Sequence, residues 1–337
     1  EHLTKGAVIM TEQHIKDLNS LKDLMKSQGD NYDYKMVEKA FDLCVTAHEG
    51  QKRRSMEDYY IHPLNVAKII VSLGLDSQSV SAALLHDVVE DTEYSLEYIK
   101  ENFGSDVALL VDGVTKIGRL NFSTKEQQQA ESLRKMLIAM GQDIRVIIIK
   151  LADRLHNMRT IEFHKPEKQK KIASETLEVY APIAHRLGLS EIKNELEDLC
   201  FQYIHREDYY HIAKLVENKK VERDAYVNEM IENISKILTE HHIEFRIFGR
   251  SKHLYSIYKK MHGQGKTFDQ IYDLYAVRII FEPDPESNET ERDQCYHVFS
   301  IITSIYHYKS DRMRDWVNAP KSNGYEALHC TLMSNSG

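Results

Sequence analysis

The chain has 337 residues, a formal net charge of −8 and a hydrophobic content of 42%. This length predicts two domains or one large one. No apolar run is long enough to cross a bilayer, and a mildly negative chain is not expected to bind nucleic acid through its bulk charge. The four cysteines are isolated, with no Cys-x-x-Cys pair. That spacing argues against a disulfide scaffold or a zinc ribbon and fits a reducing cytoplasm.

The first two-thirds of the chain has the pattern of an almost entirely helical region. Apolar residues recur at helical spacing in six stretches, which are residues 33–49, 63–74, 77–90, 126–140, 166–187 and 207–239. Residues 144–151 (Ile-Arg-Val-Ile-Ile-Ile-Lys-Leu) are rich in β-branched side chains. They fit either a strand or a buried helix.

Four imidazole or carboxylate groups lie within six residues of an otherwise apolar stretch, at His86, Asp87, Glu90 and Asp91. If the stretch is helical, Glu90 lies one turn beyond His86, and Asp91 lies one turn beyond Asp87. Two candidate metal ligands would then have two carboxylates close by. A metal that activates water, beside carboxylates that move protons, is typical of metal-assisted hydrolysis of phosphate esters.

Two further residues are candidates to complete such a site. His62 lies just before a predicted helix, and Asp153 lies in the stretch Lys150-Leu-Ala-Asp-Arg. Two histidines and two aspartates form a mixed nitrogen and oxygen donor set, which suits Mn²⁺, Fe²⁺ or Zn²⁺ better than Ca²⁺. Each residue alone also has an ordinary interpretation, since a histidine before a proline is usually a turn residue. The metal hypothesis rests on the ordered set.

The character of the sequence changes near residue 241. Strand-like alternation occurs at 244–248, 274–281 and 327–333, and helical stretches at 251–262 and 293–306 lie between these strands. This α/β alternation predicts a second domain. We expect a helical domain over residues 1–198 and an α/β domain over residues 199–337.

The second region also contains candidate nucleotide-binding groups. A basic stretch, 249–260, follows a predicted strand and opens a predicted helix, where charge and free backbone N–H groups can hold a triphosphate. Asp273 at a strand start can hold Mg²⁺. Tyr325 can stack on guanine. A solvated surface charge is the competing interpretation of each single basic residue.

Longer strings resemble a known family. The order of His62, His86-Asp87 and Asp153 resembles the HD-type metal phosphohydrolases. The strings at 86–92, 112–116, 150–160 and 180–188 resemble the Rel/SpoT-type alarmone enzymes, which are bifunctional synthetase/hydrolases of guanosine tetra- and pentaphosphate. The resemblance covers nearly the whole chain. It implies an all-α HD-type hydrolase domain followed by an α/β, mixed-sheet, nucleotidyltransferase-like synthetase domain.

For the first domain the resemblance implies a Mn²⁺ site formed by His62, His86, Asp87 and Asp153. Glu90 and Asp91 would position and deprotonate the water that attacks the 3′-pyrophosphate. The implied nucleotide contacts are Arg53, Arg54 and Ser55 for the guanine and phosphates, with Asn157 and Thr160 as further contacts. Met56-Glu57-Asp58 stands where relatives commonly have Gly-Glu-Pro. This departure bears on the shape of the loop and not on the metal ligands.

For the second domain the resemblance implies a site for ATP and for a GDP or GTP acceptor. Asp273 would hold Mg²⁺. The implied ATP-phosphate contacts are Arg250, Lys252, Lys260 and Arg278, with Ser256 and His329 as further nucleotide contacts. The implied acceptor contacts are Lys321, Asn323 and Tyr325. Arg314 takes the position of the lysine in the family's Arg-x-Lys-Asp segment, and the two side chains differ in geometry.

In members of the family that the chain resembles, a further strand follows and carries a Glu-x-Gln-Ile-Arg string, which the sequence up to Gly337 does not include. We therefore expect a catalytic fragment that hydrolyses well and synthesises poorly or not at all. Its expected partners are guanine nucleotides and ATP, with no membrane and no direct nucleic-acid contact. Ribosome contact would need further C-terminal domains. Two alternatives stay open, which are an HD-type hydrolase of another nucleotide and a non-catalytic nucleotide sensor.

Overall fold

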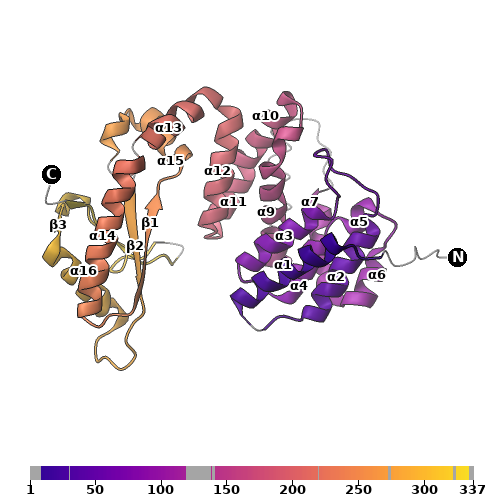
Figure 1. Cartoon of the computed structure of the whole chain (residues 1–337), viewed down its shortest axis with the longest axis horizontal. Helices are drawn as coiled ribbons and strands as arrows, with labels where there is room; N and C mark the ends of the chain where they lie inside the picture. Colours follow the sequence, from indigo (N-terminus) through magenta and orange to yellow (C-terminus); the bar gives the residue numbers. More distant parts are fainter. Residues whose placement is uncertain are drawn as a thin grey trace. The chain divides into compact units, whose positions relative to one another are not determined.

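The computed structural model describes residues 9–29, 31–118, 138, 141–218, 220–271, 275–321 and 324–333 (Figure 1). The chain divides into two compact units, Glu1–Ile204 and His205–Gly337. The expected boundary between residues 198 and 199 falls within one helix, α12 (Ser190–Ile204), and the first unit extends to the end of that helix.

The described part of the first unit is built from helices, which confirms the expected fold class. In chain order they are α1 (Glu12–Gln28), α2 (Tyr34–Ala47), α3 (Ile61–Ser72), α4 (Ser77–Leu85), α5 (Val88–Asp91), α6 (Leu96–Phe103), α7 (Ser105–Gly118), α9 (Ile144–Arg159), α10 (Pro166–Glu175), α11 (Ala181–Arg186) and α12. A 3-10 turn, η1 (Ile161–Phe163), follows α9, and a π-helical turn, η2 (Thr176–Tyr180), joins α10 to α11. One cluster of buried apolar side chains runs through these helices.

Helix α4 is buried on nearly every side. The Asp76 side chain starts the helix by accepting a hydrogen bond from the backbone N–H of Ser79 at 2.9 Å. Helices α2, α3 and α7 all pack against α4, whose small serine and alanine side chains let the backbones approach. Because a helix buried all round lies in the core, the residues that follow Leu85 also begin inside the protein.

The ambiguous residues 144–151 form the first half of helix α9. The Asp143 side chain caps this helix by accepting from the backbone N–H of Arg145 at 2.9 Å. Arg145 Nη1 also donates to Asp76 Oδ2 at 2.6 Å, which ties the starts of α4 and α9 together. The β-branched residues are helical here because α9 packs against α3, α7 and α12, and tertiary packing outweighs their weak helix preference.

The second unit combines helices with short strands, as the α/β expectation requires. Its helices are α13 (Arg206–Asn218), α14 (Lys220–Glu240), α15 (Leu254–Gln264) and α16 (Glu291–Ile305), with 3-10 turns η3 (Phe268–Gln270) and η5 (Ser310–Arg312). Its strands are β1 (Phe245–Ser251), β2 (Tyr275–Phe281), β3 (His307–Tyr308), β4 (Arg314–Asp315), β5 (Leu328–His329) and β6 (Leu332–Met333). In the described residues they form three antiparallel pairs, β1–β2, β3–β6 and β4–β5.

The β1–β2 pair runs from Phe245 opposite Phe281 to Ser251 opposite Tyr275. Alternate residues of both strands, including Ile247 and Ile279, pack with α14 and α16 around a small core. The other face of the pair carries Arg278 beside exposed apolar side chains.

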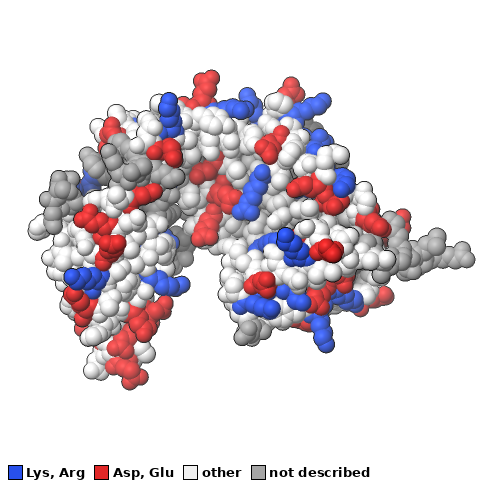
Figure 2. Space-filling model, viewed as in Figure 1, with Lys and Arg blue, Asp and Glu red and all other residues white. Residues whose placement is uncertain are grey.

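Within the described part of the chain, no helix combines the length and the apolar character needed to cross a membrane. On the face drawn in Figure 2, the acidic and basic side chains of the described residues are interspersed. A mixed surface of this kind fits a chain of small negative net charge.

Helices α7 and α9 approach closely at Gly113. A β-carbon added to Gly113 would lie 2.8 and 2.9 Å from the two γ-carbons of Val146. Real β-carbons do not make contacts this short, so the packing of α7 on α9 requires glycine at this position. The glycine in the Asp-Gly-Val-Thr-Lys string therefore has a structural reason.

We predict that Gly113→Ala destabilises the first unit by about 1–3 kcal/mol, because overpacking outweighs the higher helix propensity of alanine. Urea unfolding followed by circular dichroism measures this loss, while Trp316, the single tryptophan and part of the second unit, reports by fluorescence on a transition that should not move. In a Val146→Ala background, where the two γ-carbons are absent, the loss should disappear. A loss of the same size in both backgrounds would contradict the packing explanation.

Candidate metal centre

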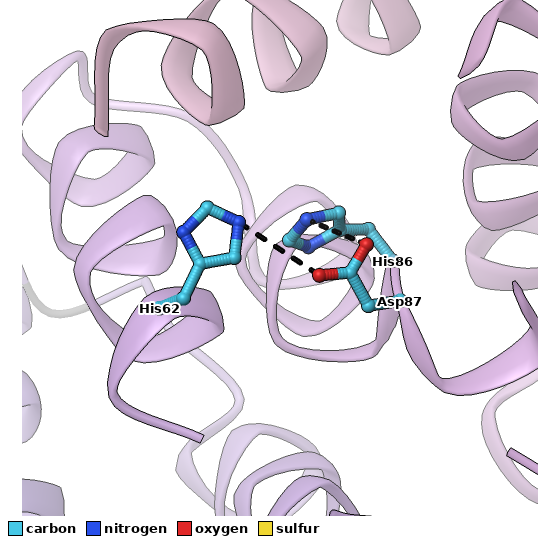
Figure 3. A group of neighbouring side chains, drawn as sticks. All are labelled: His62, His86 and Asp87. Carbon is cyan, nitrogen blue, oxygen red and sulfur yellow. Dashed lines mark ion pairs between the residues drawn. The ribbon is translucent and has the colours of Figure 1, made fainter. Parts of the chain in front are cut away.

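The adjacent residues His86 and Asp87 lie at an interruption between two helices. Helix α4 ends at Leu85 and α5 begins at Val88, and the backbone N–H of Asp91 donates to the Asp87 carbonyl at 2.8 Å. The sequence predicted one helix over 77–90, so this break was not foreseen. Consecutive side chains of a regular helix point about 100° apart. His86 and Asp87 keep right-handed helical backbone angles, and atoms of both side chains reach the space opposite His62 (Figure 3).

The structure brings the four predicted metal ligands together. One nitrogen of His62, one nitrogen of His86 and one oxygen of Asp87 all lie within 4.8 Å of one another. His62 Nε2 is 3.8 Å from Asp87 Oδ2, and His86 Nε2 is 3.2 Å from Asp87 Oδ1. Asp153, from α9, has its Oδ1 atom 3.2 Å from His62 Nε2 and 4.0 Å from His86 Nε2. Two helices, α3 and α9, and the turn between α4 and α5 thus contribute to a candidate metal site.

The hydrogen bonding of His86 fits a metal ligand. Its Nδ1 atom lies 2.7 Å from the Ala83 carbonyl oxygen, which can only accept, so Nδ1 carries the proton of the neutral ring. The other ring nitrogen, Nε2, therefore has a free lone pair. This atom is buried and has no hydrogen-bond partner among the described residues. A buried acceptor of this kind is explained by a cation, and the carbonyl is the usual partner that orients a ligating histidine.

The tautomer of His62 follows from a chain of contacts that ends at an arginine. Arg53 Nη1 can only donate, and it lies 3.2 Å from His156 Nδ1. His156 Nδ1 is therefore an acceptor, and the His62 Nδ1 atom at 2.7 Å must be the donor. Burial, together with the nearby His62 and Arg53, lowers the pKa of His156 to about 3, so His156 stays neutral in this role. His62 is left with a free lone pair on Nε2, directed at the carboxylates.

The carboxylate of Asp153 is held charged inside the protein. Burial raises its pKa, but the opposing contributions, of which the charge of Lys150 is the largest, together lower it by more, and the result is a pKa well below the usual range. Lys150 Nζ donates to Asp153 Oδ2 at 2.7 Å, and Asn157 Nδ2 donates to Oδ1 at 2.6 Å. These two bonds fix both oxygens of the carboxylate, and Asn157 also accepts from Arg53 Nη2 at 2.8 Å.

The predicted catalytic carboxylates lie on α5, directly beyond Asp87. Glu90 and Asp91 are both exposed. The Tyr59 hydroxyl lies 2.9 Å from Asp91 Oδ2 and 3.1 Å from Asp87 Oδ2. Burial, followed by the charges of Asp87 and Asp91, raises the pKa of Tyr59, so its phenol remains a donor. One hydroxyl therefore serves both a candidate metal ligand and a candidate base.

A cavity of about 230 Å³ adjoins this cluster. The residues that line it are Lys52, Arg53, Arg54, Ser55, Tyr59, Thr160, Phe163 and His164. Four of the predicted nucleotide contacts, Arg53, Arg54, Ser55 and Thr160, therefore line the same cavity. The fifth, Asn157, accepts a hydrogen bond from Arg53. Positive charge, hydroxyl groups and one half-exposed aromatic ring together suit a phosphorylated nucleoside.

The loop that carries Arg53, Arg54 and Ser55 contains a strained residue. Met56 has φ of 68° and a side chain that is 75% exposed. Its backbone N–H donates to the Arg53 carbonyl at 3.0 Å, and the Arg53 N–H donates to the Glu57 carbonyl at 2.9 Å. The loop thus keeps a left-handed turn that favours glycine, although methionine stands here.

In the second unit the structure brings some of the predicted nucleotide-binding residues together, while others lie on different elements or outside the described residues. Tyr325 OH lies 2.9 Å from His329 Nε2, Arg314 pairs with His329 across β4 and β5, and Lys321 Nζ lies 5.1 Å from the Tyr325 ring centroid. Lys252 follows β1, and the other described predicted residues lie on α15 (Ser256, Lys260) and on β2 (Arg278). Asp273 and Asn323 lie outside the described residues, and only the backbone of Arg250 is described.

The structure adds four contacting residues that the sequence analysis did not select. They are Tyr59, Lys150 and His156 in the first unit and Trp316 in the second, where Lys321 Nζ lies 4.9 Å from the Trp316 ring. Lys150 had a usable signal, because it precedes Asp153 by one helical turn. Tyr59 precedes His62 by three residues but contacts Asp87, so its partner could not be read from local spacing.

Comparisons with known proteins give two domain matches and close relatives. The HD domain family matches residues 40–190, and the region found in RelA and SpoT proteins matches residues 249–337. The chain is 46% identical over 295 residues to a guanosine-3′,5′-bis(diphosphate) 3′-pyrophosphohydrolase of Haemophilus influenzae. The aligned region covers 88% of this chain and 42% of that protein. It is 44% identical over 304 residues to a GTP pyrophosphokinase of Myxococcus xanthus, covering 89% and 39%.

A third relative carries both activities in its name. The bifunctional (p)ppGpp synthase/hydrolase SpoT of Escherichia coli is 42% identical over 318 residues, covering 94% of this chain and 44% of that protein. The chain therefore spans less than half the length of each of these relatives.

We predict that Met56→Gly raises the free energy of unfolding by up to about 1 kcal/mol, because it relieves the left-handed strain at φ 68°. Urea unfolding followed by circular dichroism measures the change. The matched control is Glu93→Gly, at an exposed loop residue without a positive φ, which should lower stability by about 0.5–1 kcal/mol. Equal destabilisation by both substitutions would contradict the assignment of strain to Met56.

Proposed function

Because this chain joins an HD domain to a RelA/SpoT region and belongs with the RelA/SpoT proteins, we propose that its first unit is a Mn²⁺-dependent hydrolase of guanosine tetra- and pentaphosphate. The products are GDP or GTP and pyrophosphate. The observation that carries this proposal is the convergence of His62, His86, Asp87 and Asp153 beside the cavity lined by Arg53 and Arg54.

The donor set supports Mn²⁺ as the metal. Two imidazole nitrogens and two carboxylates suit Mn²⁺, and the unpartnered Nε2 atom of His86 fits a cation at this point. When bound, the metal supplies a water of lowered pKa at neutral pH. Lys150, Asn157 and Ala83 hold the ligands in place, so little reorganisation is needed on binding.

The protein's own residues divide the remaining work. Glu90 and Asp91 position the attacking water, and a carboxylate oxygen of Asp91 accepts its proton. Arg54 and Ser55 bind phosphate oxygens, and Thr160 contacts the nucleoside part of the substrate in the same cavity. We do not assign Asp153 as the general base, because it is one of the proposed metal ligands and its oxygens also accept hydrogen bonds from Lys150 and Asn157.

The second unit is a pyrophosphokinase-type domain that would transfer pyrophosphate from ATP to GDP or GTP, with Mg²⁺ held by Asp273. The arrangement of Lys321, Tyr325 and His329 around one site supports binding of the acceptor nucleotide. We expect hydrolysis, and whatever synthesis this fragment supports, to take place in the cytoplasm, where these nucleotides occur.

We predict that incubation with guanosine tetraphosphate and Mn²⁺ releases pyrophosphate and GDP, and that Asp87→Ala abolishes both turnover and Mn²⁺ binding. Asp91→Asn should retain Mn²⁺ binding but lower kcat by about 10²–10⁴-fold, because it removes proton transfer. Product chromatography and titration calorimetry measure the two effects separately.

The matched control is Asp106→Asn, an exposed carboxylate of α7 that should leave both measurements unchanged. Full turnover by Asp87→Ala under metal-free conditions would rule out the proposed site. Preference for a nucleotide that lacks a 3′-pyrophosphate would favour an HD-type hydrolase of another nucleotide, and tight binding without turnover would favour a sensor.

We predict that the two arginines of the cavity differ in kinetic effect. Arg54→Ala should raise KM by about 10–100-fold with little change in kcat, because it removes a charged contact to substrate phosphate. Arg53→Ala should also lower kcat, because Arg53 holds Asn157 and His156, which contact two metal ligands. Steady-state kinetics with Lys35→Ala as an exposed control measures both, and identical effects of the two substitutions would contradict this division.

A further inference from the structure

Tyr59 occupies a position that the proposed reaction does not yet use. Its hydroxyl is within hydrogen-bond distance of two carboxylates, Asp87 at 3.1 Å and Asp91 at 2.9 Å. Asp87 is a candidate metal ligand and Asp91 a candidate base, and a phenol has a single proton to donate. Tyr59 also lines the nucleotide cavity.

The ring of Tyr59 is held in place before any ligand binds. It stacks on His48 with centroids 4.6 Å apart, and its backbone N–H donates to the Gln51 carbonyl at 3.1 Å. His48 is itself buried and fixed, with its Nδ1 atom 2.9 Å from Gln51 Oε1. Gln51 Nε2 lies 3.5 Å from the Asp91 carbonyl oxygen, so Gln51 contacts both Tyr59 and Asp91. A donor supported in this way imposes a geometry on its acceptors.

We propose that Tyr59 is a positioning residue that holds Asp91 beside Asp87, so that the base stays oriented toward the water it deprotonates. A ligated Asp87 has its charge balanced by the metal. The single phenol proton then stabilises the Asp91 carboxylate, which has no such balance. Tyr59 therefore acts on turnover through Asp91 and only weakly on metal binding. The inference rests on the proposed hydrolase function.

The test compares Tyr59→Phe with wild type in turnover of guanosine tetraphosphate and in Mn²⁺ binding by calorimetry. We expect kcat at saturating Mn²⁺ to fall by about 10–100-fold, which is the usual effect of losing a supporting partner. KM and the Kd for Mn²⁺ should stay within about threefold, since neither the cavity charge nor the metal ligands change. The matched control is Tyr60→Phe at the neighbouring residue. The Tyr60 hydroxyl donates to Asp17 at 2.9 Å, and Asp17 is not part of the candidate site.

Recovery of full kcat at saturating Mn²⁺ would overturn the proposal, because it would place the effect on metal binding through Asp87. A second test uses the Asp91→Asn background, where we expect Tyr59→Phe to change single-turnover rates by less than about twofold. A loss as large as in wild type would also overturn it. Absence of turnover by the wild-type chain would instead refute the proposed hydrolase function, so the two failures are distinguishable.

Discussion

The burial of polar side chains inside a helical core is the constraint on which the first unit depends. His62, His86 and Asp153 are 3%, 2% and 5% exposed. Groups like these are costly in a protein interior unless they are hydrogen-bonded or bind a cation. Each is held by a hydrogen bond from or to a neighbouring group, and each also directs one atom at a shared point. The bonds that make burial tolerable therefore also aim the ligand atoms.

Much of this unit could be predicted from the sequence, because helical spacing and the ordered His, His-Asp and Asp residues are local signals. The break between α4 and α5 could not, because the apolar periodicity continues through it. Residues 144–151 stayed ambiguous, since their β-branched composition opposes the helix that packing against α3 and α7 imposes. The metal role of the gathered residues stays a prediction.

Contacts between distant segments were the main thing that the sequence did not reveal. Tyr59 bonds a residue 28 positions away, and Arg53 bonds one 104 positions away. In the second unit, β4 and β5 are two residues long, and their pairing sets Arg314 opposite His329. Strands this short carry no periodic pattern, so contacts to neighbours such as Trp316 could not be read from the sequence, and the binding roles of Arg314 and His329 stay predictions.

Helix α9, with its C-cap residue Thr160, joins the candidate metal site to the neighbouring cavity. Lys150, Asp153, Asn157 and Thr160 follow one another along one side of it at steps of three or four residues, so they serve both sites from a single stripe. A helix advances 1.5 Å per residue. A slide of α9 by that amount would move the metal ligand and the substrate contacts together. An axial shift of α9 is thus expected to displace the candidate metal ligand Asp153 and the cavity residue Thr160 together.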